Sequence, residues 1–216
     1  AAVRFYGHGR NALFEALRLA GAAGRRVLLP SFICRDLLAS VAAAGAEPVF
    51  HGVAPDLRPD KDPASWPDAA AVIAVDYFGF AQDLAPYKAY SRRCGALIIE
   101  DAAHALFSRD ASGHLLGTRA PLGVLSLRKS LPLANGGALI ASDAALAARL
   151  PVQIPFKPIP GHRPALKAAV RPLLALGGAK AAHAALTVIR SLRGDASGHR
   201  VADPDSERIL PPDAPC

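Results

Sequence analysis

The chain has 216 residues, 51% of them hydrophobic, and a formal net charge of +7. This is enough apolar material for one folded domain with a substantial core, and no apolar run reaches the roughly 18 residues that a membrane helix requires. A positive charge is also typical of nucleic-acid-binding proteins, but the chain has no recognisable nucleic-acid module and no aromatic residues interleaved with its bases, so we expect no nucleic acid partner.

Helical and strand patterns alternate from the beginning of the chain. Residues 9–24, "GRNALFEALRLAGAAG", place small and apolar side chains on one helical face and predict a helix that opens after Gly9 and closes on glycines. The run "RVLLPSF", residues 26–32, predicts a buried strand. A helix over residues 34–45 and a strand over 47–53 follow.

The same alternation continues to residue 150. After a loop rich in proline and aspartate, the patterns predict a strand at 69–79, a helix at 84–95, strands at 96–102, 123–128 and 138–143, and a short helix at 144–150. Strands that alternate with helices are typical of βαβ units. We therefore predict an α/β fold, a three-layer αβα arrangement around a mostly parallel sheet.

The alternation stops after residue 150. We predict one domain over residues 1–150, a proline-rich linker over 151–164, a helical segment over 165–194 and an irregular or disordered tail over 195–216. The bases of the helical segment are interpreted as the solvated face of amphipathic helices. Because the sequence has no methionine and ends without a helix or strand, we expect it to be a piece of a longer protein.

A glycine turn opens the first predicted helix. "GHGRNA", residues 7–12, matches the dinucleotide fingerprint with alanine in the last place. That site also needs a full strand before the glycines and an acid at the end of the next strand, and "VRFY" and "PSFIC" are poor candidates for these. The safer prediction is a helix N-terminus at Gly9 that binds phosphate through its N–H groups, with hydrogen bonds from Arg10 and Asn11. A plain helix cap explains the stretch equally well.

Two acids and a histidine follow the apolar strand in "IIEDAAHA". Functional groups collect at the carboxyl ends of parallel strands, so Asp101 is well placed to meet a ligand. A metal site made of Asp101 and His104 lacks a third ligand, and we predict none. Glu100 is interpreted as a surface or ion-paired carboxylate. For His104 alone, a hydrogen-bonded interior histidine is the alternative.

Lys129 lies in "LSLRKSLPLANGG", between two apolar runs. Ser126 is predicted within the strand that precedes the lysine, and "NGG" allows a tight return to the next strand. A lysine beside the active edge of a sheet can lose enough solvation to act as an amine nucleophile and to form a Schiff base. An ordinary loop lysine is the alternative for Lys129 taken alone.

The quoted stretches, in this order, resemble the DegT/DnrJ/EryC1/StrS family of pyridoxal phosphate enzymes, which includes many sugar aminotransferases. The blocks that match are "GRNALFEAL", "LPSFICRDLLASVAAAGAEPVF", "VDYFGFAQD", "IIEDAAHA" and "SLRKSLPLANGGALIASD". The resemblance implies an aspartate aminotransferase-like (fold type I) large domain over residues 1–150, incomplete at its N-terminus and without the small C-terminal domain.

The resemblance implies roles for three residues of the last two blocks. Lys129 corresponds to the lysine that forms the Schiff base with pyridoxal 5′-phosphate and then moves protons. Asp101 corresponds to the acid that pairs with the pyridine nitrogen, keeping it protonated so that the ring can accept electrons. His104 takes the position of a glutamine or histidine beside the cofactor ring.

The resemblance also implies contacts with the rest of the cofactor. Ser126 and the Gly9–Asn11 turn resemble phosphate contacts, and Phe32 resembles a stacking or pocket residue. Ser126 lies three residues before the lysine, as in a branch of the family with "SLRK" blocks, and Asn135 stands where an acid often precedes the two glycines. These departures bear on the identity of the substrate.

The function implied is an aminotransferase that takes an amino group from a donor such as glutamate to a nucleotide-linked keto sugar, in polysaccharide or secondary-metabolite biosynthesis. Dehydrases of the family replace the lysine with histidine, so Lys129 favours transamination. The resemblance also implies a homodimer in the full-length protein. A catalytically inactive relative with a regulatory or binding role is the alternative from a different class, and another pyridoxal phosphate reaction is a second.

Cysteine usage bears on the compartment. Cys34, Cys94 and Cys216 are few, widely spaced and odd in number, which is typical of reduced thiols and not of a disulfide framework. The first residues lack the layout of a secretory signal. We predict a cytoplasmic protein without a membrane span.

Overall fold

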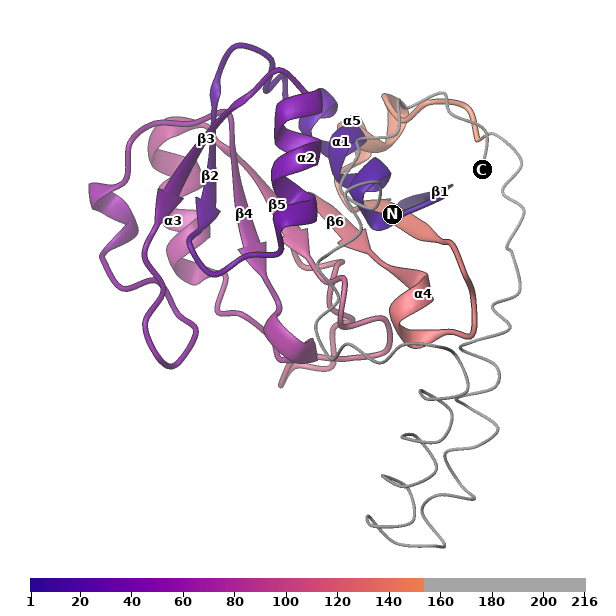
Figure 1. The fold of residues 1–216 in the computed structure, drawn as a ribbon. Coiled ribbons are helices and arrows are strands. Elements are labelled where there is room, and N and C mark those ends of the chain that lie inside the picture. The colour runs from indigo at the N-terminus through magenta and orange to yellow at the C-terminus, as the bar shows by residue number, and fades with distance from the viewer. Residues whose placement is uncertain (154–216) are drawn as a thin grey trace, which may run out of the picture.

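The computed structural model describes residues 1–153, and predictions for residues 154–216 lie outside the described part. The described residues form one sheet with helices on both of its faces (Figure 1). The elements are β1 (Ala2–Tyr6), α1 (Gly9–Leu19), β2 (Arg26–Pro30), α2 (Arg35–Ala43), β3 (Glu47–His51), η1 (Pro63–Ser65), β4 (Ala71–Val75), η2 (Tyr77–Gly79), α3 (Ala85–Cys94), β5 (Leu97–Asp101), β6 (Leu122–Leu125), α4 (Leu127–Ser130), β7 (Gly137–Ala141) and α5 (Ala144–Ala148).

The sheet has seven strands in the order β1-β7-β6-β5-β4-β2-β3. Neighbours from β3 to β6 are parallel, and β7 runs antiparallel to both β6 and β1. The prediction of an α/β fold with a mostly parallel sheet is confirmed. Strand β1 differs from expectation, because "VRFY" looks like a poor strand in isolation. It forms because β7 pairs with it over its whole length.

Each face of the sheet carries its own apolar core. One core lies between the sheet and helices α1, α2 and α5, and includes Leu17, Ile73 and Ile99. The other lies between the sheet and α3, and includes Val72 and Tyr87. Because strand side chains alternate between faces, residue 101 shares the α1 face with residue 99, whereas residue 100 points to the opposite face.

The segment after β6 differs from the sequence prediction. Ser126 was expected inside a strand, but β6 ends at Leu125 and Ser126 is the N-cap residue of the short helix α4. The Leu127 N–H donates to the Gly136 carbonyl over 3.0 Å. This long-range bond draws residue 127 toward the start of β7, so the chain leaves the sheet before the lysine. A strand pattern in the sequence does not reveal that turn.

Glycine is required where β7 begins. A Cβ on Gly137 would lie 2.3 Å from the carbonyl atoms of His8 and 2.5 Å from the Gly9 nitrogen. Real Cβ atoms do not approach the backbone so closely, so only glycine fits. The Gly136 N–H also donates to the Gly7 carbonyl. The "NGG" stretch thereby brings the start of α1 beside the turn that carries Lys129.

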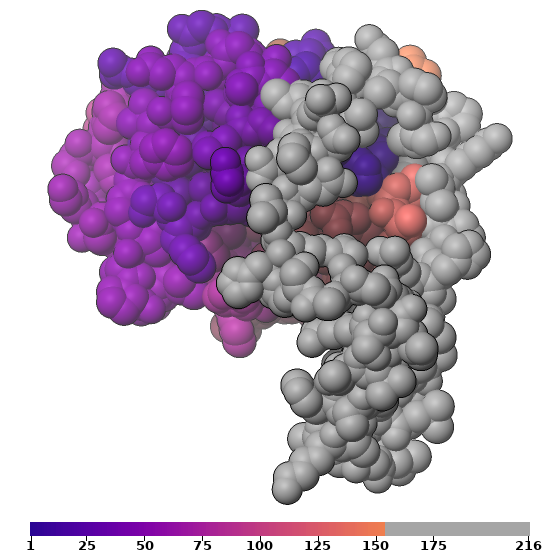
Figure 2. Space-filling model, viewed as in Figure 1, coloured from indigo at the N-terminus to yellow at the C-terminus, as the bar shows by residue number. Residues whose placement is uncertain are grey.

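Large apolar side chains are exposed at the carboxyl edge of the sheet. Phe32 follows β2, Phe78 and Phe80 follow β4, and Phe107 follows β5, with 55%, 64%, 77% and 72% of their surface exposed. In the same view as Figure 1, the purple residues occupy the left of the visible surface (Figure 2). None of the described helices has the length and apolar character needed to cross a membrane.

Candidate active site

A cavity of about 460 Å3 lies at the carboxyl ends of β5 and β6, next to the start of α1. This volume is within the roughly 300–1,000 Å3 typical of small-molecule sites. The cavity brings together five of the predicted site residues from three segments of the chain, namely Gly9, Arg10, Asp101, Ser126 and Lys129. It lies where the fold predicts a ligand site, at the carboxyl edge of a mostly parallel sheet.

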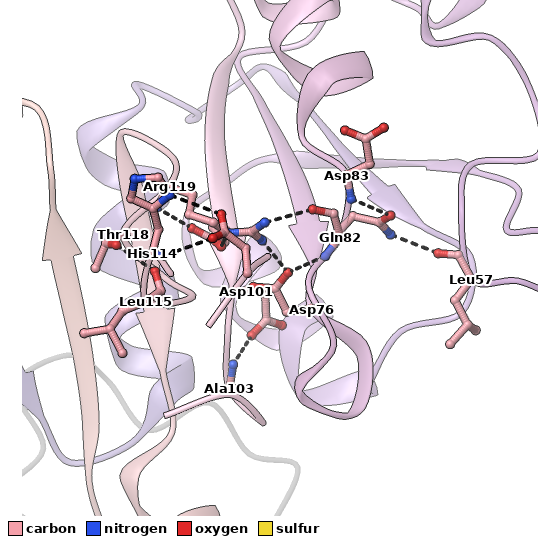
Figure 3. A network of polar contacts seen from close by, with 12 residues as sticks. Leu57, Asp76, Gln82, Asp83, Asp101, Ala103, His114, Leu115, Thr118 and Arg119 are labelled. Carbon is pink, nitrogen blue, oxygen red and sulfur yellow. Dashed lines mark hydrogen bonds and ion pairs between the residues drawn. The ribbon is translucent and has the colours of Figure 1, made fainter. Parts of the chain in front are cut away.

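Asp101 is the buried acid of this cavity. It ends β5 on the α1 face, and one carboxylate oxygen accepts the Ala103 N–H over 3.0 Å (Figure 3). Burial raises the pKa of Asp101, while the Ala103 N–H and the positive charges of Lys129 and His104 oppose that shift. A cationic ligand atom facing the carboxylate would stabilise its charged form.

Lys129 and His104 contact one another at the cavity. Lys129 is exposed on α4 and lines the cavity, and its Nζ lies 2.9 Å from His104 Nε2. His104 sits on the loop after β5 and reaches the site through this contact. Burial and the charge of Lys129 lower the pKa of His104, with Asp101 opposing. The imidazole is therefore neutral at neutral pH and accepts from the ammonium.

Positive charge gathers at the other end of the cavity. His8 is the N-cap of α1 and makes no side-chain capping hydrogen bond. Burial lowers the pKa of His8, and the positive charges of Arg10 and Arg128 lower it further, with Asp36 opposing. A Cβ on Gly9 would touch Ser126 at 3.4 Å, so the serine lies directly against the helix start. The positive end of the α1 dipole and the guanidinium groups of Arg10 and Arg128 favour a phosphate here.

Three predicted site residues do not line the cavity: His104, which reaches it only through its contact with Lys129, and Asn11 and Phe32. The Asn11 N–H donates to the His8 carbonyl over 3.1 Å, within the first turn of α1, and its side chain does not line the cavity. Phe32 packs on Tyr77 with ring centroids 5.6 Å apart, and its carbonyl accepts the Tyr77 hydroxyl over 2.7 Å. The geometry gives no support to a phosphate contact by Asn11 or a pocket role for Phe32.

Sequence reasoning missed other residues of the cavity. Cys34, Asp36 and Leu37 line it from the start of α2, and Arg128 lines it beside Lys129. A signal existed for the first three, since α2 begins directly after β2 at the carboxyl edge of the sheet. Arg128 could have been identified from its position directly before Lys129 in the sequence. His8, by contrast, lines the cavity because the start of β7 packs against the turn before α1.

Behind the cavity, on the opposite face of the sheet, Arg119 joins two buried carboxylates (Figure 3). Its Nε donates to Glu100 over 2.6 Å and its Nη2 to Asp76 over 2.7 Å. Glu100 is thus ion-paired, one of the two interpretations offered for it. Burial and the charge of Glu100 raise the pKa of Asp76 to about 7, although the hydrogen bond from the Gln82 N–H and the charge of Arg119 lower it. This pairing fixes the ends of β4 and β5, and the Asp101 carbonyl accepts the Asp76 N–H over 3.0 Å.

Residues 1–153 contain no group of three His, Cys, Asp or Glu side chains arranged to hold a metal ion. The chemistry available in the cavity is that of an amine beside an imidazole, a buried carboxylate and a positively charged end. This set can bind a phosphorylated ligand that also carries a cationic ring atom and a group reactive toward amines.

Comparisons with known proteins identify relatives of the chain. The sequence model of the DegT/DnrJ/EryC1/StrS aminotransferase family matches residues 6–153. The chain is 34% identical over 149 residues to the L-glutamine:2-deoxy-scyllo-inosose aminotransferase of Streptomyces kanamyceticus, which covers 66% of this chain and 35% of that protein. It is 32% identical over 150 residues to a pleiotropic regulatory protein of Geobacillus stearothermophilus. That match covers 65% of this chain and 40% of the Geobacillus protein.

Solved structures are similar over the same region. A DegT DnrJ EryC1 StrS aminotransferase from Brucella abortus has a TM-score of 0.61 and 28% identity, covering 74% of this chain and 49% of that one. DesV of S. venezuelae, in complex with a ketimine intermediate, has a TM-score of 0.59 and 29% identity. The match covers 68% of this chain and 42% of the DesV chain. The chain therefore spans less than half the length of each of these relatives.

Proposed function

Because this chain belongs to the DegT/DnrJ/EryC1/StrS aminotransferase family, we propose that the protein is a pyridoxal 5′-phosphate-dependent aminotransferase acting on a keto sugar. The observation that carries the proposal is one cavity lined by Asp101, Lys129 and Ser126 beside the start of α1. An amine, a buried carboxylate and an anion-binding helix start are what such an enzyme needs, and the sheet places all three at one edge.

The residues present fit the cofactor. Asp101 is buried and has a raised pKa, and among the described residues its carboxylate receives one hydrogen bond, that of the Ala103 N–H. A protonated pyridine nitrogen would stabilise its charge. The phosphate would lie where Gly9 packs against Ser126, near Arg10 and Arg128. When bound, pyridoxal 5′-phosphate supplies an aldehyde that condenses with amines and a protonated ring that draws electrons from the adjacent substrate carbon.

In this mechanism each residue has a distinct task. Lys129 Nζ binds the cofactor between turnovers and then carries a proton to and from the substrate carbon. The Asp101 carboxylate accepts a hydrogen bond from the ring nitrogen and keeps that nitrogen protonated. Ser126 and the first N–H groups of α1 bind the phosphate and orient the ring. Both halves of a ping-pong transfer use the same lysine.

For the substrates, we propose an amino acid donor and a nucleotide-linked keto sugar as acceptor. The support for the nucleotide-linked sugar is the family, and the name of the Streptomyces relative, L-glutamine:2-deoxy-scyllo-inosose aminotransferase, supports an amino acid donor. Glutamine therefore joins glutamate as a donor to be tested. Production of amino sugars for polysaccharides or secondary metabolites in the cytoplasm is the corresponding place in metabolism.

A second candidate function is regulatory or binding activity without transamination. The names of two relatives favour it, the pleiotropic regulatory protein of Geobacillus stearothermophilus and the erythromycin biosynthesis sensory transduction protein EryC1 of Saccharopolyspora erythraea, 33% identical over 152 residues. The presence of both Lys129 and Asp101 in one cavity argues against it, because a scaffold has no need of an amine and a buried acid at the same ligand.

The two functions are separated by a half reaction without sugar. The purified protein is loaded with pyridoxal 5′-phosphate and mixed with glutamate or glutamine in turn. We expect one donor to convert the bound cofactor to its amine form and to release one equivalent of the matching keto acid. Retention of the original absorption spectrum with every donor tested, by protein that does hold the cofactor, would support the regulatory function instead.

A further inference from the structure

The contact between His104 and Lys129 joins two segments that lie far apart in sequence. The Nζ and Nε2 atoms are 2.9 Å apart although the residues are 25 positions apart, one on α4 and the other on the loop after β5. A neutral imidazole nitrogen accepts a hydrogen bond from an ammonium group, whereas an imidazolium has no free lone pair. As long as Lys129 is an ammonium, the contact therefore requires a neutral His104 with its lone pair on Nε2.

The loop after β4 packs beside His104. Phe78 lies parallel to it, with 3° between the ring planes and 6.4 Å between centroids. Phe78 has φ 55° and Gly79 has φ 88°, a left-handed conformation that a bulky residue seldom adopts unless its surroundings impose it. A Cβ on Gly79 would lie 3.1 Å from the His104 carbonyl oxygen. The two loops are thus packed against one another at the His104 backbone, and the exposed His104 ring lies between Phe78 and Lys129.

Two charged groups of the described residues act on His104, Lys129 from α4 and Asp101 from the end of β5. Burial lowers the pKa of His104 below its ordinary value of 6.5, Lys129 lowers it further and Asp101 opposes. Protonation of His104 therefore requires a pH below that ordinary value. It would place two cations within hydrogen-bonding distance, which is unfavourable.

We propose that His104 is the positioning residue and proton acceptor of Lys129: Nε2 holds the ammonium at the cavity and takes one proton from Nζ when the amine is used. In that transfer Nζ changes from ammonium to amine with a free electron pair, Nε2 becomes imidazolium, and the total charge of the pair is unchanged. A glutamine at position 104 could accept the hydrogen bond but not the proton. The expected effect on cofactor capture rests on the proposed function, whereas the hydrogen bond between His104 and Lys129 does not depend on it.

The first test needs no cofactor. The titration of His104 is followed by NMR of its ring Cε1–H in the cofactor-free protein and in Lys129→Met, with His104→Gln used to assign the signal. We expect the midpoint to rise by roughly half a pH unit or more when the ammonium is removed. His114, whose ring lies beside Asp110, serves as internal control and should titrate identically in both proteins. An unchanged His104 midpoint would overturn the pair.

The second test measures capture of pyridoxal 5′-phosphate from pH 5.5 to 8, followed by absorbance and by mass spectrometry after borohydride reduction. We expect the full protein to react roughly 10-fold faster than His104→Gln at pH 8, with the ratio approaching one as His104 becomes protonated. His114→Gln should follow the parent at every pH. A parent-to-variant ratio independent of pH would overturn proton acceptance. A shifted midpoint with no capture by any protein would overturn the proposed function and leave the pair standing.

Discussion

The character of Asp101 comes from its position as the last residue of a buried strand. Its side chain shares the α1 face with Ile99, and burial raises its pKa. In the proposed enzyme its negative charge has one purpose, to keep the ring nitrogen protonated. The neighbouring Glu100 has the same chemistry but points to the other face, where Arg119 neutralises it. Two adjacent carboxylates thus serve two different roles because strand side chains alternate.

Asp101→Asn tests this role directly. Asparagine keeps the size and the acceptor for the Ala103 N–H but removes the charge, so we expect an unchanged fold and a donor half reaction slower by about 100-fold or more. Rapid mixing with the donor measures the rate, and circular dichroism checks the fold. Asp110→Asn, a change at a residue outside the cavity, is the matched control and should keep the parent rate. A near-parent rate in Asp101→Asn would show that this acid does not face the ring nitrogen.

At the scale of elements, β4 and β5 are joined at their carboxyl ends by the Asp76–Arg119–Glu100 network. Two buried carboxylates share one guanidinium, so the pair retains a proton at higher pH than isolated acids do. The pKa of Asp76 is raised from 3.8 to about 7 in the folded protein. The folded state therefore binds more protons than the unfolded state between these values. This contribution to stability is fully present below pH 3.8 and is lost as the pH rises through 7.

Asp76→Asn should flatten that pH dependence. Asparagine keeps an acceptor oxygen for the Gln82 N–H and Arg119 and leaves a single carboxylate for the guanidinium. We expect the free energy of unfolding of the parent to decrease between pH 5 and pH 8. The decrease should exceed that of Asp76→Asn by on the order of 1 kcal/mol. Urea denaturation at both pH values measures it, with the exposed Asp56→Asn as control. Equal slopes in parent and Asp76→Asn would contradict the shared proton.

Gly137→Ala tests how β7 positions the phosphate end of the cavity. The added methyl would meet the His8 carbonyl at 2.3 Å, so we expect the start of α1 to be displaced, with a loss of roughly 1–3 kcal/mol of stability and weaker cofactor binding. Gly9→Ala is the control for stability, because its nearest contacts would be an ordinary 3.4 Å. Thermal unfolding and cofactor titration provide the two readouts. If Gly137→Ala had the stability and cofactor affinity of the parent, the turn before α1 would be able to move without consequence for either.

The elements also show what the sequence could predict. The helices and parallel strands follow from local periodicity, and Asp101 and Lys129 could be found because reactive groups collect where parallel strands end. The α4 turn depends on a bond between Leu127 and Gly136, and β1 depends on its pairing with β7. Such long-range contacts leave no local signal. For the same reason, Arg119 could not be recognised as the partner of Glu100.

At the scale of the whole molecule, we propose that two copies assemble through the carboxyl edge of the sheet. The four exposed phenylalanines 32, 78, 80 and 107 gather there, and exposed apolar patches commonly mark interfaces. Phe80→Asp should shift the purified protein from dimer to monomer in sedimentation velocity. Phe50→Asp is the control, because Phe50 is exposed within the edge strand β3 and not on a loop that follows a strand. A monomeric parent with full activity would contradict the dimer.

The central claim is that Lys129 holds pyridoxal 5′-phosphate in this cavity. Its most direct test is to incubate the purified protein with the cofactor, reduce it with borohydride, digest it and identify the modified residue by mass spectrometry, with Lys129→Ala and the surface variant Lys88→Ala alongside. We predict a yellow protein that loses its absorption band on reduction, a single phosphopyridoxyl group on Lys129, no such group in Lys129→Ala and full labelling in Lys88→Ala. A colourless protein with unmodified Lys129, or equal labelling of other lysines, would contradict the account.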